Sequence, residues 1–260
     1  MKTITWLVVA IIIIGGGFYL LNSYLYDTTP AAPTETVTES PVQVTPISHA
    51  TALLTWGETS IYTDPTGGTT TFAGAPAADI ILVTDIHGDH FSTSTLALLV
   101  GSSTSLIVPQ AVKDLLPASL AAQAKVLANG QTISEQGFQV TGIAMYNLPQ
   151  ATSSPHIKGR GNGYMIEKDG YRVYVAGDTS GTPEMRALTG IDIAFIPMNL
   201  PYTMSVEEAA DAVLTFKPKQ VYPYHYRGQD GLADINRFKS LVNAGDPAID
   251  VVLADWYPAQ

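Results

Sequence analysis

The chain has 260 residues, of which 46% are hydrophobic, so it can bury a sizeable core in one large domain with appendages. It contains no cysteine, which excludes disulfides, thiolate metal ligands and a cysteine nucleophile. Its net charge of −10 argues against binding to nucleic acid and against non-specific docking on anionic lipid.

The first 26 residues are almost entirely apolar. The uncharged stretch from Thr3 to Tyr26 is long enough to cross a hydrocarbon core, which takes roughly 20 residues. It is longer than a signal-peptide core, and no small-residue cleavage site follows closely. We therefore expect a membrane anchor over residues 1–26, with a cleaved signal as the alternative. After Lys2 the next lysine or arginine is Lys113, so the positive-inside rule predicts an extracytoplasmic domain, which would be secreted if the segment is cleaved.

Residues 27–45 are rich in proline, threonine and glutamate, with scarcely any large apolar side chain. This composition predicts an extended spacer between the anchor and the domain. The alternative is that its last few residues form an ordered arm on the domain. The folded domain is then expected over residues 46–260.

From residue 46 onward, strand patterns and helix patterns alternate. Strands are predicted at 49–65 (two, around a turn), 78–85, 105–109, 131–147, 161–180 (a hairpin), 191–199, 220–226 and 249–258. Helices are predicted at 95–101, 111–124, 182–188, 205–216 and 233–245. Two β-rich halves, each alternating with helices, predict two sheets packed together with helices outside.

Two of these helices carry start signals. Thr182 precedes Pro183, which suits the first helical position. Ser205 and Glu208 have the spacing of a capping box, in which Ser205 reaches forward and Glu208 reaches back.

The segment "ILVTDIHGDHFS" concentrates potential metal ligands at the end of an apolar strand. It holds two of the five histidines of the chain and two aspartates within six residues. Loop polarity alone would explain one or two such residues, since Asp and Gly form turns. A catalytic metal site needs several nitrogen and oxygen donors that converge from strand ends and loops. The residues that meet this description are Asp85, His87, Asp89, His90, His156, Asp178 and His225.

This pattern resembles the HxHxDH signature of the metallo-β-lactamase-fold hydrolases, followed by a lone histidine, a Gly-Asp-Thr and a final histidine. The resemblance extends over residues ~46–258. The segments "GDTSGTPEM", "PMNLPYTM" and "PYHYRG" are most similar to the branch that contains L-ascorbate-6-phosphate lactonase. The fold that this implies is an α/β (α+β) four-layer αββα sandwich, with the metals at the edge between the sheets.

The resemblance also implies two divalent metal ions. One would be held by Asp85, His87 and His156, the other by Asp89, His90 and His225, with Asp178 bridging both. Asp85 stands where the signature has its first histidine, and a carboxylate is a harder ligand that favours manganese or iron more than imidazole does. Zinc is still the first expectation, with Mn²⁺ or Fe²⁺ as alternatives. Asp85 could instead accept a hydrogen bond from a ligand histidine without touching the metal.

Two further residues are candidates for the border of the site. Asp64 ends an early strand and is expected to orient a metal ligand from behind, the alternative being a plain turn residue. His49 either faces the cleft and donates to a substrate oxygen or lies on the surface.

Three tyrosines and two basic residues have open roles. Tyr202, Tyr224 and Tyr226 are candidate pocket hydroxyls, although tyrosines in strands more often serve packing. Lys158 and Arg160 are expected to be solvated loop charges, with contact to an anionic substrate as the alternative.

The function predicted from these features is that of a metal-dependent hydrolase. Two cations would lower the pKa of a shared water, and the hydroxide would attack an acyl carbon or a phosphorus of a small molecule. Asp89 or Asp178 would carry the proton to the leaving group. The resemblance favours an ester or lactone over a phosphate ester. The oligomeric state is left open.

Two alternatives belong to other functional classes. One is a membrane-tethered binding module that keeps the fold without the chemistry. The other is a diiron redox enzyme on the same fold, but His87 stands where that family is expected to have a glutamate.

Overall fold

The computed structural model describes residues 40–258. The predicted anchor at 1–26 and the part of the predicted spacer before residue 40 lie outside the described residues. In the part that is described, no helix is long and apolar enough to cross a membrane. Strand β1 (Val42–Ser48) includes the last residues that we assigned to the spacer, and it pairs with β2, as the alternative of an ordered arm requires.

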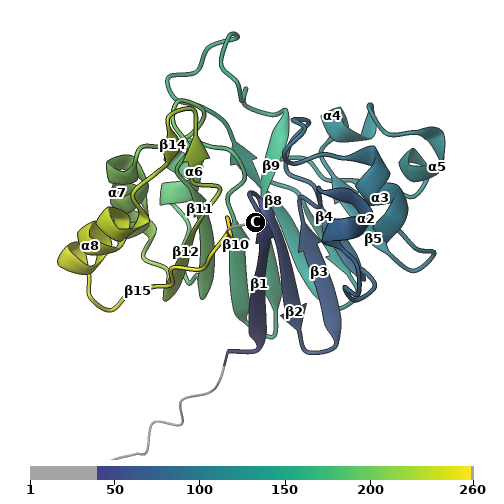
Figure 1. The fold of residues 1–260 in the computed structure, drawn as a ribbon, viewed down its shortest axis with the longest axis horizontal. Coiled ribbons are helices and arrows are strands. Elements are labelled where there is room, and N and C mark those ends of the chain that lie inside the picture. Colours follow the sequence, from purple (N-terminus) through teal and green to yellow (C-terminus); the bar gives the residue numbers. More distant parts are fainter. Residues whose placement is uncertain (1–39, 259–260) are drawn as a thin grey trace, which may run out of the picture. The chain divides into compact units, whose positions relative to one another are not determined.

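The first sheet has six strands in chain order, of which β1 to β3 are antiparallel and β3 to β6 are parallel. After β1 these strands are β2 (Thr51–Trp56), β3 (Thr59–Thr63), β4 (Ile80–Leu82), β5 (Ser105–Val108) and β6 (Lys125–Val126). The helices on this side are α2 (Gly68–Thr71), α3 (Thr93–Leu99), α4 (Gln110–Lys113) and α5 (Ala118–Ala121) (Figure 1).

The second sheet has seven strands in the order β15-β12-β11-β10-β9-β8-β7. Its strands are β7 (Thr132–Glu135), β8 (Phe138–Met145), β9 (Gly161–Lys168), β10 (Tyr171–Val175), β11 (Ile193–Pro197), β12 (Gln220–Tyr224) and β15 (Asp250–Val251). The pairs from β7 to β10 are antiparallel, and the pairs β10–β11, β11–β12 and β12–β15 are parallel. On this side lie α6 (Pro183–Arg186), α7 (Val206–Phe216), α8 (Ile235–Gly245) and a small hairpin of β13 (Arg227–Gly228) and β14 (Gly231–Leu232).

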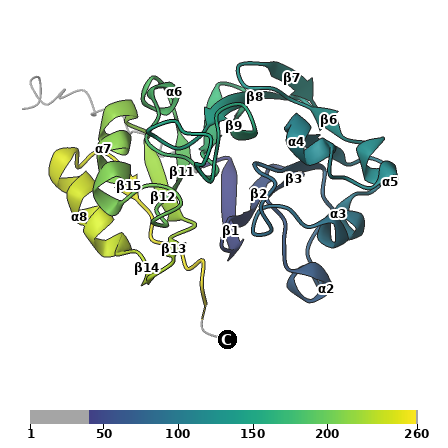
Figure 2. The ribbon, with the colours of Figure 1, turned by 90° about the horizontal axis from the view of Figure 1, so that it is seen from above.

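The two sheets lie face to face between two layers of helices, so the predicted αββα sandwich is confirmed (Figure 2). Strand β4 shows why its sequence is apolar throughout. Ile80 and Leu82 belong to the cluster between the sheets, whereas Ile81 joins the cluster under the helices of the first sheet. Successive strand residues point to opposite faces, and here both faces are covered.

The predicted helix starts are confirmed, with one difference. The Thr182 hydroxyl accepts the N–H of Met185, and the Ser205 hydroxyl accepts the N–H of Glu208. The second half of the predicted capping box is wrong, because the Glu208 carboxylate accepts the N–H of Gly181 instead. This contact ties the start of α7 to the loop that follows β10.

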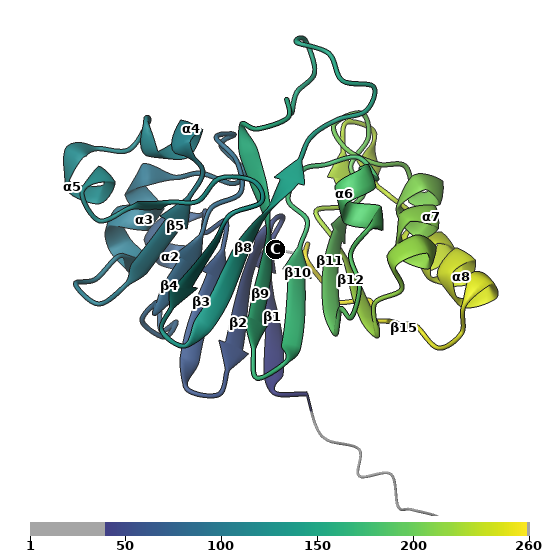
Figure 3. The same ribbon diagram turned by 180° about the vertical axis from the view of Figure 1, so that it is seen from behind.

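The parallel strands of both sheets end at the same edge of the sandwich. Asp64 follows β3, the segment 83–90 follows β4, Asp178 lies shortly after β10, and His225 comes directly after β12. Figure 3 shows the loop between β8 and β9 extending past this edge. Side chains at the carboxyl ends of the parallel strands can therefore converge there with those of this loop.

Candidate metal centre

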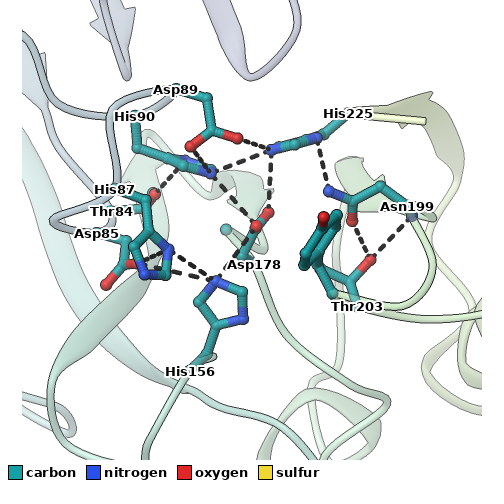
Figure 4. Close-up of polar contacts among 12 residues, drawn as sticks. Thr84, Asp85, His87, Asp89, His90, His156, Asp178, Asn199, Thr203 and His225 are labelled. Carbon is teal, nitrogen blue, oxygen red and sulfur yellow. Dashed lines mark hydrogen bonds and ion pairs between the residues drawn. The ribbon is translucent and has the colours of Figure 1, made fainter. Parts of the chain in front are cut away.

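All seven predicted ligand residues lie together at this edge (Figure 4). They form two sets, and Asp178, which we count with the second set, also approaches a histidine of the first. We name the set of Asp85, His87 and His156 the Asp85 group, and the set of Asp89, His90, Asp178 and His225 the His90 group.

The donor atoms of the His90 group have the spacing of a metal-ligand set. His90 Nε2 and His225 Nε2 are 3.1 Å apart, and Asp89 Oδ2 is 3.3 Å from His225 Nε2. Metal–nitrogen bonds of about 2.0–2.1 Å in a tetrahedron place the ligand atoms roughly 3.3 Å from one another. The residues of this group thus fit a divalent cation.

Asp178 reaches both groups. Its Oδ2 is 3.4 Å from His90 Nε2 and 3.4 Å from His156 Nε2, and its Oδ1 is 3.3 Å from His225 Nε2. Although Oδ1 is buried, it makes no hydrogen bond. A buried carboxylate oxygen without a hydrogen bond is costly unless a cation compensates it, so this atom also fits a metal site.

Two of the histidines make hydrogen bonds through Nδ1, on the side of the ring that faces away from the donor cluster. His90 Nδ1 donates to Asp64 Oδ2 at 2.7 Å, and Asp64 also accepts the N–H and the hydroxyl of Thr84. Asp64 therefore contacts a predicted ligand histidine on the side away from the donor cluster, which is the position that an orienting role requires. His156 Nδ1 donates to the side-chain oxygen of Asn147 at 3.1 Å. These bonds fix the tautomer in which Nε2 is free to bind a cation.

Asn199 holds the ring of His225. Its side-chain nitrogen lies 3.0 Å from His225 Nδ1, and its side-chain oxygen accepts the hydroxyl of Thr203. These two contacts orient the imidazole so that Nε2 faces the donor cluster. We did not predict Asn147 or Asn199. The only signal in the sequence is that each follows a buried strand, β8 and β11 respectively.

Arg160 was predicted to be a solvated loop charge, and this prediction is wrong. Its Nε is 3.1 Å from Asp85 Oδ1 and its Nη2 is 3.0 Å from Asp85 Oδ2. Asp85 Oδ2 also lies 2.8 Å from His87 Nδ1, so both predicted roles of Asp85, as a ligand and as an acceptor for a histidine, agree with the geometry. Burial opposes the charge on Asp85, but the hydrogen bonds from His87 and Arg160 hold its pKa below the ordinary value.

The charges of the His90 group depend on one another. Burial opposes the ionised form of Asp178, yet His225 and His90 hold its pKa below the ordinary value. Burial likewise opposes the charged form of His90, yet Asp178 and Asp64 raise its pKa well above the ordinary value. The buried carboxylates thus attract positive charge to this point, which a bound cation can supply.

His49 lies at the site and not on the outer surface. Its Nε2 is 3.2 Å from Asp89 Oδ2, and its ring centroid is 4.0 Å from that of His225. Its Nδ1 is 2.7 Å from the Tyr257 hydroxyl. The imidazole therefore links Asp89 to the carboxyl-terminal segment of the domain.

The three candidate tyrosines have different positions. Tyr202 is 41% exposed and lines a cavity beside the two groups. The prediction of a pocket hydroxyl is wrong for Tyr224, which is buried and accepts the N–H of Gly177 at 2.8 Å. It is also wrong for Tyr226, whose buried side chain accepts the N–H of Trp256 at 3.4 Å.

Three residues of the site have a left-handed backbone. The φ angles are 56° at His49, 43° at Asp64 and 48° at His225. A non-glycine residue in this conformation costs about 1–2 kcal/mol. The conformation turns each side chain toward the donor cluster directly at the end or start of a strand.

A cavity of about 270 Å³ opens onto both groups. Its lining consists of His87, Asp89, Pro155, His156, Asp178, Asn199 and Tyr202. A space of this size at a cluster of potential metal ligands suits a small substrate.

Comparison with known proteins agrees with this geometry. Residues 43–225 match the family model described as the beta-lactamase superfamily domain. A protein named a metal-dependent hydrolase from Thermus thermophilus is 33% identical over 213 residues, which cover 75% of this chain and 91% of that protein.

Solved structures show the same architecture. One from Parabacteroides distasonis, described as a metal-dependent hydrolase, is 37% identical, with a TM-score of 0.72 and coverage of 82% of this chain and 92% of that one. A metallo hydrolase from Ignicoccus hospitalis has a TM-score of 0.69 at 22% identity, over 82% of this chain and 95% of that one, and shows the fold alone.

Proposed function

The chain belongs to the metallo-β-lactamase superfamily and is a metal-dependent hydrolase, and from this premise we propose that it cleaves an ester or lactone bond in a small, uncharged substrate. The cations would be held by the His90 group and the Asp85 group. Bound there, they supply an electrophile and a hydroxide nucleophile near neutral pH. We first expect Zn²⁺, with Mn²⁺ or Fe²⁺ as alternatives, because the donors are imidazoles and carboxylates without thiolate.

The proposal of an acyl substrate rests on the side chains that line the cavity. Among the described residues that line the cavity there is no lysine or arginine. The two nearby cationic side chains are engaged elsewhere, Lys158 with Glu184 and Arg160 with Asp85. Recognition of a phosphate group commonly uses free Arg or Lys side chains. An ester or lactone bond needs only hydrogen-bond donors at its carbonyl oxygen.

Two residues of the lining have proposed roles. Asp89 faces the cavity with a half-exposed carboxylate, which we propose accepts the proton of the nucleophile and passes it to the leaving group. Asp178 is the alternative proton carrier, but its burial favours cation binding. The exposed Tyr202 offers a hydroxyl that can donate to the carbonyl oxygen as negative charge develops there.

A substrate panel tests this proposal. The full-length protein, loaded with Zn²⁺ or Mn²⁺, is assayed with p-nitrophenyl acetate, simple γ-lactones, p-nitrophenyl phosphate and bis-p-nitrophenyl phosphate. We expect kcat/KM for the best acyl substrate to exceed that for either phosphoester by about 100-fold or more. Faster cleavage of a phosphoester would contradict the acyl assignment, and metal binding without any turnover would favour a non-catalytic binding module.

Tyr202→Phe supplies the matched variant for this assay. Loss of one donor to the developing oxyanion lowers kcat by about 100-fold or more where the donor is well placed. Tyr222→Phe is the control, because Tyr222 lies in β12 and stacks on Phe195 away from the cavity lining.

We also propose that residues 1–26 anchor the protein in a membrane with the hydrolase domain outside the cytoplasm. The support is the long uncharged stretch at the start of the chain and the absence of a lysine or arginine between Lys2 and Lys113. In a bacterial host, the full-length chain should stay in the membrane after carbonate extraction and be degraded by protease added to spheroplasts. A soluble protein of the uncleaved mass would contradict the anchor, whereas a soluble, shortened protein would support a cleaved signal.

A further inference from the structure

The two ligand groups differ in how their carboxylates are paired. Asp85 is fully buried, and both of its oxygens accept from Arg160, with Nε at 3.1 Å from Oδ1 and Nη2 at 3.0 Å from Oδ2. Such a two-pronged pair fixes the relative orientation of the guanidinium and the carboxylate. The Arg160 side chain is itself only 18% exposed.

The backbone holds this pair in place. The N–H of Asn162 donates to the carbonyl of Thr84 at 2.9 Å, so the start of β9 is bound to the segment that carries Asp85. A Cβ atom at Gly161 would lie 2.7 Å from the same carbonyl oxygen, so glycine permits this close approach. Arg160 Nη2 also donates to the carbonyl of Pro155. The guanidinium is therefore a fixed part of the site.

The pairing of Asp85 with Arg160 gives the two groups different net charges. In the Asp85 group, Arg160 cancels the charge of Asp85, so apart from Asp178, which approaches both groups, the group carries no net charge when its histidines are neutral. In the His90 group, Asp89 and Asp178 form ion pairs only with histidines among the described residues, so two carboxylates lack a lysine or arginine partner. A divalent cation is attracted far more strongly to the second group than to the first.

We propose that Arg160 sets the cation affinity of the Asp85 group, so that the protein holds one cation tightly in the His90 group and a second weakly and exchangeably in the Asp85 group. This inference rests on the cation sites of the proposed function. It goes beyond that function because the occupancy of the Asp85 group would then depend on the concentration of free metal around the protein. At low metal concentration the protein holds a single cation, with the Arg160 charge beside the vacant Asp85 group.

A series of variants that changes only the charge of the Asp85 group tests the inference in the full-length protein. The group has a net charge of about −1 in Arg160→Gln, zero in the wild type and +1 in Asp85→Asn. Zn²⁺ and Co²⁺ are titrated in competition with a chelating dye, bound metal is counted by elemental analysis after desalting, and Co²⁺ absorption separates the sites.

We expect the weaker dissociation constant to fall in Arg160→Gln by about 10- to 100-fold, the range by which residues behind metal ligands change affinity. It should rise in Asp85→Asn, while the tight site is unchanged in both. Arg237→Gln is the control, because Arg237 pairs with Glu207 between α8 and α7.

The direction in which Arg160→Gln changes the weaker dissociation constant tests the inference. If Arg160 merely positions Asp85 as a ligand, the weaker site becomes weaker still or is unchanged, and the inference is overturned. Two equally tight cations in the wild type would also overturn it.

If Arg160→Gln does not fold, Asp85→Asn/Arg160→Gln leaves no unpaired charge and should bind the second cation more tightly than Asp85→Asn alone. Equal affinities of those two variants would reject the inference. The absence of any bound cation in all variants would instead refute the proposed metal sites themselves.

Discussion

An Asp178→Asn variant is expected to lose hydrolytic turnover by more than about 100-fold. That factor is the upper end of the loss for residues that only contact a metal ligand, and Asp178 is a predicted ligand itself. Asp178 is the carboxylate whose oxygens approach histidines of both groups, at 3.3–3.4 Å. Asparagine keeps the shape but removes the charge and one acceptor oxygen. We therefore expect bound metal to fall in parallel with turnover, as elemental analysis of the purified protein would show.

The matched control is Asp192→Asn. Asp192 is also buried, but it accepts the N–H of Arg172 and pairs with Lys219 at the far end of the second sheet. This variant should keep its metal even where its stability falls. An Asp178→Asn protein with full metal content and full turnover would show that the shared carboxylate does not hold a cation.

Removal of metal is expected to lower the thermal stability of the domain substantially. A ligand present at 1,000 times its dissociation constant stabilises the folded state by about 4 kcal/mol. For a domain of this size that corresponds to a fall in Tm of roughly 8–16 °C on chelation. The physical reason is that chelation leaves Asp178, buried and with an oxygen that makes no hydrogen bond, among the carboxylates of the site.

Thermal unfolding followed by circular dichroism, with EDTA and after reloading with Zn²⁺ or Mn²⁺, measures this effect. The metal that restores more of the Tm lost on chelation is the one that binds better. In Asp178→Asn the shift on chelation should be much smaller. An unchanged Tm in the wild type would mean that the folded state gains nothing from a cation.

The sequence was sufficient to select seven residues that come together in the fold, because six of them follow from a local pattern. Four lie within a span of six residues that begins three residues after β4, and Asp178 and His225 each come within three residues of the end of a buried strand. Such positions are set by strand ends, which apolar runs reveal. The sandwich could be predicted for the same reason, since it needs only the order of strands and helices.

Apart from Asp64, the residues that contact the predicted ligands from behind could not be predicted, because they depend on distances that cross the fold. Arg160 is 75 residues from Asp85, and nothing in the loop around Arg160 distinguishes a buried guanidinium from a solvated one. Asn199 is a neutral residue whose role arises only where β11 and β12 lie side by side. Strand β1 was missed because its proline and threonine content resembles a spacer, whereas Pro46 is tolerated on an edge strand.

At His49, Asp64 and His225 the left-handed backbone sets stability against function. Glycine would adopt each of these conformations without the strain, so backbone strain alone would favour glycine at all three positions. The side chains that glycine would remove belong to the donor cluster or its support: His49 and His225 approach Asp89, and Asp64 holds His90. A glycine at any of the three would relieve the backbone at the expense of the site, so this chain stores strain where its function requires a side chain.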